Sequence, residues 1–222
     1  MRYPPGYKEK KRRELLKTIG HLIKKNGFAA TGIDTLMQRT GMTSGAFYSH
    51  FASKNELLQA LVASELTASS ALWAGRTQDS VEEWIDSELE RYLSLQHVQH
   101  PEEGCLLPAL AAEIARADAS VRTIYEQALL QGHCILSRRL GDDDLAWAVI
   151  NQMVGSILVA RALPSETLQR TLLNASKNVL KSLLQRRKSP EGRAAQWVEP
   201  STGAFADNAA EIPPRPCPSA GG

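Results

Sequence analysis

The sequence is poor in cysteine and contains no long apolar segment. Its 222 residues include three cysteines, Cys105, Cys134 and Cys217. This odd number at wide spacing argues against a disulfide framework and favours a reducing compartment. No run of 18 apolar residues occurs, and the basic start MRYPPGYKEKKRR is followed by an amphipathic stretch rather than by the apolar block of a signal segment. We therefore expect a cytoplasmic protein with no membrane partner.

Signatures of catalysis and of metal binding are also missing. The sequence has no G-x-G-x-x-G, Walker loop, H-E-x-x-H or paired-cysteine motif, and the serine between Gly41 and Gly45 is displaced by one position from a nucleophile elbow. His97, His100 and Cys105 supply only two imidazoles three residues apart and a distant thiol, which is too few ligands for a zinc site. We predict that the protein is not an enzyme and holds no cofactor or metal.

The formal net charge of +2 hides a strong asymmetry along the chain. Residues 1–54 contain 11 Lys and Arg against three acidic residues, whereas residues 55–188 contain 13 against 17. A positive potential concentrated in one short segment is typical of a nucleic-acid-binding domain.

A helix-turn-helix pattern follows the basic start, between Thr31 and Glu56. Thr31 is a suitable N-cap for a short helix that carries Ile33, Leu36 and Met37 on one face. Gly41 predicts a left-handed turn, after which Thr43 caps a second short helix that begins at Ser44. Ser53 and Glu56 then form a capping box at the start of a long apolar helix.

The second short helix has a distinctive outer face. Phe47 and Phe51 are four residues apart and must point inward together, so Ser44, Gly45, Tyr48 and Ser49 point outward. This small, polar, uncharged face suits close approach to a DNA groove, and Lys54 at the next helix start favours a phosphate. The alternative is a structural helical protein in which Tyr48 or His50 packs at a domain edge.

Through T-x-I-x-x-L, the turn G-M-T, then G-A-F-Y-S-H-F and S-K-x-E-L-L, the sequence resembles the TetR/AcrR family of bacterial transcriptional regulators. The resemblance is close over about the first quarter of the chain. Unlike many members, this chain has Ser44 rather than a basic or bulky residue at the second position of the recognition helix. The resemblance assigns DNA contacts to the following residues, beside which Gly45 permits close approach: Thr31, Thr43, Ser44, Ala46, Tyr48, Ser49, His50 and Lys54.

The helical periodicity and the resemblance together predict an all-α protein. We expect a three-helix helix-turn-helix domain at residues 1–56, a helical ligand-binding and dimerisation bundle at residues 57–188, and a disordered tail at residues 189–222 that holds six of the chain's 11 prolines. Within the bundle, the spacing predicts one helix from Val81 to about His97.

A bundle that opens a pocket would line it with its aromatic residues, although a core role is the alternative for Trp73, Trp84 and Tyr92. The candidate ligand contacts are Trp73, Trp84, Tyr92, Cys105, Tyr125, Trp147 and Met153. Glu113 stands in a run of alanines and leucines and is interpreted as a surface acid rather than as a partly buried hydrogen-bonding group.

Two long helices near the C-terminal end, from about Asp142 to Leu163 and from Glu166 to about Arg187, are apolar on more than one face. One small bundle cannot cover both faces, so we expect them to meet a second copy, as in the family's four-helix dimer interface. The predicted interface residues are Met153, Ile157, Leu172, Val179, Leu180 and Leu183.

Together with these features, the resemblance implies a homodimeric repressor that a small-molecule effector of unknown identity releases from a palindromic double-stranded DNA operator. One alternative is a helix-turn-helix protein that binds DNA constitutively and has no ligand. A second alternative is a thiol-based electrophile or redox sensor that acts through Cys105, because GCLLPALAAEI is similar to a segment of electrophile-sensing family members. Against that sensor stands a buried, inert thiol.

Overall fold

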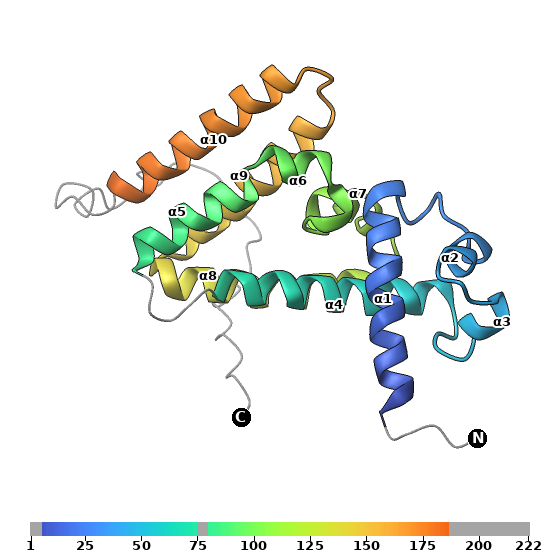
Figure 1. Ribbon diagram of the computed structural model, residues 1–222. Helices are drawn as coiled ribbons and strands as arrows, with labels where there is room; N and C mark the ends of the chain where they lie inside the picture. The colour runs from blue at the N-terminus through green and yellow to red at the C-terminus, as the bar shows by residue number, and fades with distance from the viewer. Residues whose placement is uncertain (1–5, 75–79, 187–222) are drawn as a thin grey trace, which may run out of the picture.

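The computed structural model describes residues 6–74 and 80–186, and within these ranges the chain contains helices and no strand (Figure 1). The all-α prediction is therefore confirmed. No helix in these ranges is long and apolar enough to cross a membrane. The predicted tail at residues 189–222 lies outside the described residues. The elements are α1 (Tyr7–Asn26), α2 (Ile33–Arg39), α3 (Ser44–Phe47), α4 (Lys54–Ala74), α5 (Val81–Tyr92), α6 (Leu95–Gln99), the 3-10 helix η1 (Pro101–Glu103), α7 (Leu107–Ile114), α8 (Ala119–Leu140), α9 (Asp143–Arg161) and α10 (Glu166–Arg186).

Helices α1, α2 and α3 gather at one end of the molecule, where the blue segments lie in Figure 1. Helix α1 buries Leu15, Ile19 and Ile23 on one face. It ends where Gly27 adopts a φ of +83°, and the turn between α2 and α3 uses Gly41 at a φ of +69°. Both glycines have a positive φ, which other residues rarely adopt, so the sequence fixes both reversals locally.

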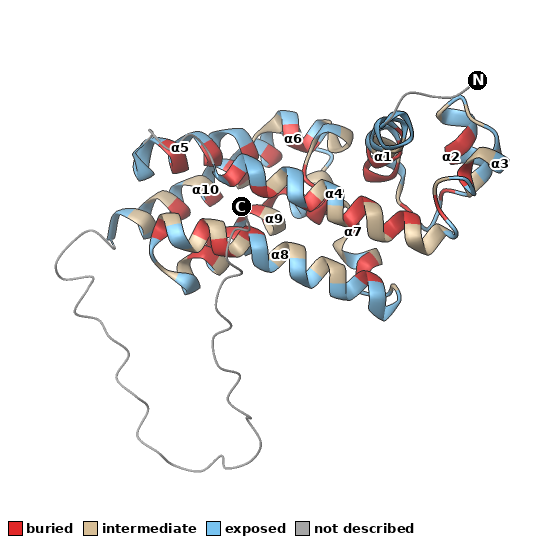
Figure 2. Ribbon diagram, turned by 90° about the horizontal axis from the view of Figure 1, so that it is seen from below, coloured by how far each residue is buried: buried red, intermediate tan, exposed pale blue. Residues whose placement is uncertain are grey.

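Helix α4 joins this end to the rest of the molecule. The Ser53 hydroxyl accepts the Glu56 N–H at 3.1 Å, as expected for a helix start, but the Glu56 carboxylate accepts from Ala52 N–H and not from Ser53. Farther along, α4 lies side by side with α8 (Figure 2). One element therefore belongs both to the helix-turn-helix and to the bundle.

The predicted helix from Val81 to His97 is two helices. It breaks at Leu93, and α6 starts afresh because the Ser94 hydroxyl accepts the His97 N–H at 3.2 Å. The break frees the carbonyl of Tyr92, which accepts a hydrogen bond from the His97 ring at 2.8 Å. Apolar spacing alone did not reveal this competing cap.

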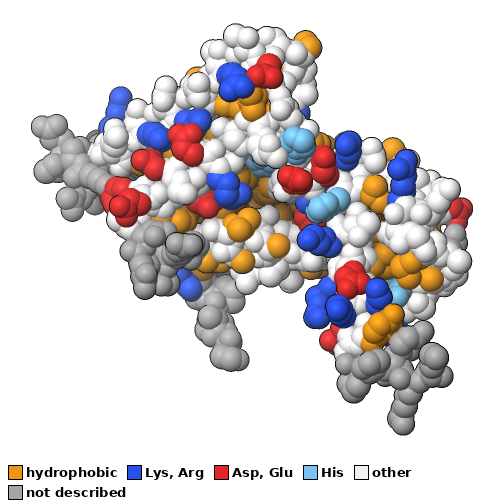
Figure 3. Space-filling view, in the orientation of Figure 1, with side chains coloured by type: hydrophobic (Ala, Val, Ile, Leu, Met, Phe, Trp, Pro, Cys, Tyr) orange, Lys and Arg blue, Asp and Glu red, His pale blue; other side chains and the backbone are white. Residues whose placement is uncertain are grey.

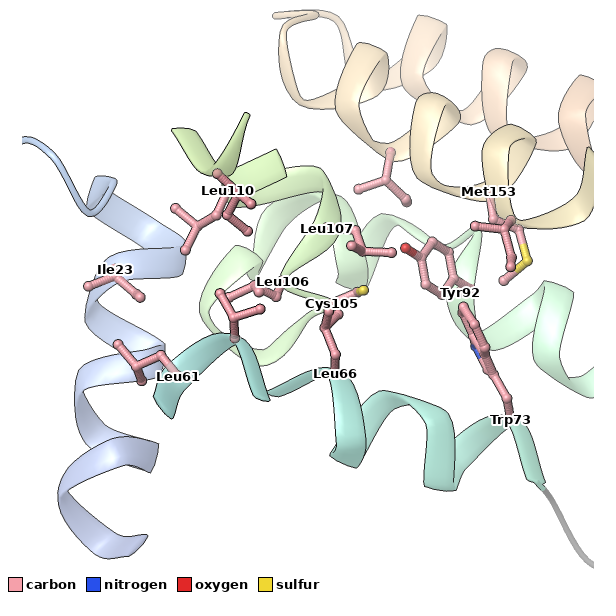
Figure 4. Packing of buried hydrophobic residues seen from close by; sticks show 14 of the residues in the cluster. Ile23, Leu61, Leu66, Trp73, Tyr92, Cys105, Leu106, Leu107, Leu110 and Met153 are labelled. Carbon is pink, nitrogen blue, oxygen red and sulfur yellow. The ribbon is translucent and has the colours of Figure 1, made fainter. Parts of the chain in front are cut away.

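Buried side chains form one continuous core through both parts of the described chain. Figure 4 shows it running from Ile23 on α1, past Leu61 and Leu66 on α4 and Leu110 on α7, to Met153 on α9. Apolar contacts therefore continue across the junction between α1 and the bundle.

Candidate nucleic-acid interface and ligand cavity

We call the residues from Thr43 to Phe51 the recognition turn. Its buried residues fix the backbone so that the Tyr48 side chain points outward. Thr43 Oγ1 accepts the Ala46 N–H at 3.3 Å, and the Phe51 N–H donates to the Phe47 carbonyl at 2.9 Å. Phe47 and Phe51 are fully buried, as predicted. Tyr48 packs edge-on against Phe47 with 63% of its surface exposed, so its phenol is free to contact a partner.

Most of the other predicted contact residues are accessible. Thr43, Gly45 and Ser49 are exposed, Ala46, His50 and Lys54 are half-buried, and the Ser44 side chain lies outside the described part of the structure. The Ser49 hydroxyl donates to the Ala46 carbonyl at 2.7 Å, which fixes its orientation.

Thr31 differs from its predicted role. Its hydroxyl donates to the Gly27 carbonyl at 2.7 Å and the residue is only 7% exposed, whereas Gly32 is the N-cap of α2. A terminal carbonyl of α1 needs a donor, and Thr31 satisfies it. Thr31 therefore closes the loop between α1 and α2, so its predicted role as the N-cap of α2 is wrong.

Lys54 is held near the same loop. Its Nζ lies 3.5 Å from the Ala29 carbonyl oxygen and 4.6 Å from the centroid of the Phe28 ring. Both contacts orient the ammonium group at the start of α4, where a phosphate is electrostatically favoured.

An open groove of about 880 Å³ separates the start of α1 from the recognition turn. Lys8, Lys11, Ser49 and His50 are among its lining residues. Figure 3 shows Lys and Arg side chains gathered over this end of the molecule. Burial, followed by the charges of Lys8 and Arg12, lowers the pKa of His50, so its ring is neutral at pH 7. The groove thus combines positive charge with polar groups that contact a phosphate backbone readily.

A second hollow, of about 270 Å³, lies inside the junction between α1, α4, α5, α6 and the loop before α7. We call it the cavity. Of the predicted ligand contacts, it is lined by Trp73, Tyr92 and Cys105.

The other four predicted contacts do not line the cavity, because each packs elsewhere. Trp84 lies under the Arg139 guanidinium at 4.2 Å, and Trp147 stacks on His133 at 4.1 Å. Met153 is buried in the core, and Tyr125 is half-buried on α8. Helical spacing predicted that these side chains are apolar or buried, but not which of them border empty space.

His97 uses both ring nitrogens within the protein. Nδ1 donates to the Tyr92 carbonyl at 2.8 Å, and Nε2 accepts the Cys105 N–H at 3.0 Å. Burial lowers its pKa to about 4, so the neutral ring persists at pH 7. Neither nitrogen is left to bind a metal, and the described residues include no group of three or more His, Cys, Asp or Glu that could hold one.

The loop that His97 holds is tightly packed. A methyl group on Gly104 would lie 2.3 Å from His97 Cδ2, and Arg161 Nη2 donates to the His97 carbonyl at 3.0 Å. Cys105 is a buried free thiol whose Sγ lies 4.0 Å from the Ser69 hydroxyl.

Lys24, near the end of α1, is a buried lysine. Its Nζ lies 2.8 Å from Glu65 Oε2 and 3.0 Å from the Gly104 carbonyl, and its side chain is only 4% exposed. Lys24 also lines the cavity. The cavity wall thus includes a charged group of α1, and the start of the same helix lines the open groove beside the recognition turn. The sequence offered no signal of this burial beyond the position of Lys24 next to the buried Ile23.

Glu113 makes a second link between the bundle and the helix-turn-helix. Its carboxylate accepts N–H groups from Phe28 at 3.1 Å and from Ala29 at 2.6 Å. The interpretation of Glu113 as a surface acid was therefore wrong, and the hydrogen-bonding alternative is correct. The acceptor comes from α7 and the donors from the loop that follows α1, a separation of more than 80 residues that no local pattern reveals.

The predicted dimer residues divide into two groups. Met153, Ile157 and Leu180 are at most 3% exposed and pack inside the protomer, so they are not available to a second copy. Leu172 is half-buried, whereas Val179 and Leu183 are exposed. The exposed apolar surface of α9 and α10 also includes residues that the prediction omitted: Leu158, Val159 and Leu168.

Comparisons with known proteins agree with this geometry. Residues 15–61 match the model of the bacterial regulatory proteins of the tetR family. A 50-residue segment, 22% of this chain, is 50% identical to YerO of Bacillus subtilis (strain 168), an uncharacterized HTH-type transcriptional regulator, and spans 17% of that protein.

Solved structures extend the likeness in fold to the bundle. The reduced form of E. coli NemR superposes with a TM-score of 0.66 at 22% identity, covering 77% of this chain and 96% of NemR. A TetR transcriptional regulator from Chloroflexus aurantiacus J-10-FL gives a TM-score of 0.65 at 20% identity, covering 80% and 96% of the two chains.

Proposed function

We propose that the chain is a transcriptional regulator of the TetR family, and that it acts as a cytoplasmic homodimeric repressor that a small molecule releases from a near-palindromic DNA operator. In this proposal residues 1–56 bind DNA, whereas residues 57–188 bind the effector and dimerise. The observation that carries it is the shared wall: Lys24 belongs to the helix that borders the DNA-facing groove and also lines the cavity.

The recognition turn supports the DNA-binding part. The exposed Tyr48 phenol stands beside Ser49 and a groove that contains Lys8 and Lys11, which suits entry into a major groove flanked by phosphates. Two such turns related by two-fold symmetry fit half-sites about one helical turn apart.

The exposed apolar residues of α9 and α10 support the dimer. Leu158, Val159, Leu168, Val179 and Leu183 are each at least 41% exposed, which is unusual for so many aliphatic side chains on two neighbouring helices.

The test of the dimer uses two adjacent residues of α10. Val179→Glu introduces a charge on the exposed face and is expected to give folded monomers that lose operator binding, measured by sedimentation and by fluorescence anisotropy. Leu180→Glu introduces the same charge into the core and is expected to unfold the chain. A Val179→Glu monomer that keeps wild-type operator affinity would contradict the proposal.

The operator is found by selecting bound duplexes from a random pool. Near-palindromic sequences are expected, and selection of a single asymmetric site would contradict dimeric binding.

The cavity favours ligand control over constitutive binding, since a constitutive protein has no need of hollow space beside α1. Cys105 is only 8% exposed, which favours packing over thiol sensing. Treatment with a mild alkylating agent is expected to leave operator affinity equal in the wild type and Cys105→Ser. A loss confined to the wild type would favour the sensor.

A further inference from the structure

Lys54 holds its ammonium group against the loop between α1 and α2, residues 27–32, which we call the first loop. The Lys54 Nζ lies 3.5 Å from the Ala29 carbonyl oxygen and 4.6 Å from the centroid of the Phe28 ring. A carbonyl dipole and a ring face orient an ammonium group without neutralising it. The positive charge at the start of α4 is therefore available to a DNA phosphate, in a position that the first loop determines.

The bundle holds the same two residues of the first loop. Helix α7 packs against α1 (Figure 1), and Glu113 of α7 accepts the Phe28 N–H at 3.1 Å through Oε1 and the Ala29 N–H at 2.6 Å through Oε2. Hydrogen bonds to a carboxylate are stronger than those between neutral groups. Because Glu113 and Lys54 bind the same two residues, fixing their N–H groups also restrains the carbonyl and the ring that contact Lys54.

The start of α4 is tied to the same region of the bundle. Asn55, the residue after Lys54, donates to the Ser120 hydroxyl at 3.3 Å, and Gln59 donates to that hydroxyl at 2.9 Å. Ser120 lies in the first turn of α8, the helix that follows α7. One corner of the bundle, where α7 leads into α8, thus holds both the first loop and the helix start that carries Lys54.

We propose that Glu113 is a positioning residue for DNA binding, which orients Lys54 toward a phosphate by fixing the first loop. The inference rests on the proposed function, since it concerns a DNA contact of the proposed repressor. A carboxylate near DNA repels the phosphates, so loss of the Glu113 charge would by electrostatics alone strengthen DNA binding. The positioning role requires the opposite result, because a released first loop no longer orients Lys54.

The test compares Glu113→Gln with Glu126→Gln, which removes the same charge from an exposed position of α8. Fluorescence anisotropy measures binding of the full chain to the operator duplex selected from the random pool, at a temperature where circular dichroism shows both variants folded. Glu113→Gln is expected to weaken operator binding about threefold or more and to lower the slope of log affinity against log salt by up to about one. Glu126→Gln is expected to keep wild-type affinity. Wild-type or tighter binding by Glu113→Gln would overturn the proposal, as would equal weakening by both variants.

A double-mutant cycle with Lys54→Ala distinguishes positioning from general destabilisation. If Glu113 acts through Lys54, Glu113→Gln weakens operator binding in the wild-type chain but has no further effect in the Lys54→Ala chain. If the two losses of binding free energy add, Glu113 acts independently of Lys54 and the proposal fails.

A measurement without DNA separates this inference from the proposed function. Protons above an aromatic ring resonate upfield, so the Phe28 ring should shift the NMR signal of the Lys54 ε-methylene protons upfield in the free chain. The shift is expected to persist in Glu126→Gln and to be lost in Glu113→Gln, and its persistence in Glu113→Gln would contradict the positioning role. If the shift behaves as expected but no duplex is selected, the proposed function fails and the link from Glu113 to Lys54 stands. If a selected duplex binds wild type and Glu113→Gln equally, only this inference fails.

Discussion

The recognition turn and the cavity wall each contain a tyrosine, but the two tyrosines differ in their exposure to solvent. Tyr48 is 63% exposed, whereas Tyr92 is 2% exposed. The recognition turn is one continuous stretch held by its own caps, but the cavity wall is assembled from four helices and a loop. Residues that contact DNA must be exposed on the surface. A site that binds a small molecule must exclude water, so that a few hydrogen bonds determine the affinity. Four predictions sharpen this comparison.

The largest effect is expected from adjacent aromatics of the recognition turn. Phe47→Ala should lower the free energy of unfolding by about 3–5 kcal/mol, because it empties a fully buried site. Tyr48→Ala should leave unfolding unchanged and weaken operator binding by about 1–3 kcal/mol. Thermal melting and anisotropy titrations measure both. Equal destabilisation by the two variants would assign Tyr48 a structural role and contradict the view that its exposed side chain is available to DNA.

The next effect concerns pH and the cavity wall. Burial lowers the pKa of His97 from 6.5 to about 4, so between these values the unfolded chain binds more protons than the folded chain. Stability should therefore fall as pH falls through this window, by up to about 3 kcal/mol. His97→Gln, which keeps a donor and an acceptor, should flatten this part of the pH profile measured by urea denaturation. An unchanged profile would show that His97 does not carry it.

A smaller effect is expected at the link made by Glu113. Glu113→Gln weakens the hydrogen bonds to the N–H groups of Phe28 and Ala29, so unfolding should cost about 1 kcal/mol less and those two amides should exchange faster with solvent. Glu126→Gln alters an exposed acid of α8 and is the matched control. If both variants exchange alike at Phe28 and Ala29, the link has no influence on the loop.

The smallest effect is expected at Lys54. Lys54→Ala should reduce the slope of log affinity against log salt by about one, because one phosphate contact is lost. Lys177→Ala removes a charge that is paired with Glu90 on the far side of the bundle and should leave the slope unchanged. Equal slopes for wild type and Lys54→Ala would mean that Lys54 only anchors the loop through Ala29.

The recognition turn was predictable because its determinants are local. Gly41, Thr43 and the pair Phe47 and Phe51 each act within a few residues, so their types and spacing define the turn. The hydrogen bonds of Thr31 and Ser94 were not predicted correctly. The Thr31 hydroxyl bonds to the Gly27 carbonyl, and the Ser94 hydroxyl accepts the His97 N–H, and in both cases spacing alone does not say which nearby backbone group a hydroxyl binds. Leu180 and Val179 were predicted to lie in one interface because both are apolar. Leu180 is instead buried within the protomer and Val179 is exposed, and periodicity does not distinguish a helix face that packs inside the protomer from one that remains exposed.

The sequence by itself determined the helical class, the position of the recognition turn and the concentration of positive charge at one end, because propensity, capping and charge are properties of short segments. Only the tertiary structure decided that Lys24 is buried against Glu65, that Glu113 holds a loop more than 80 residues away, and that Tyr92 but not Trp84 borders the cavity. Those outcomes depend on the packing of distant helices against one another, and burial then decides whether a polar side chain meets water, a protein partner or a ligand.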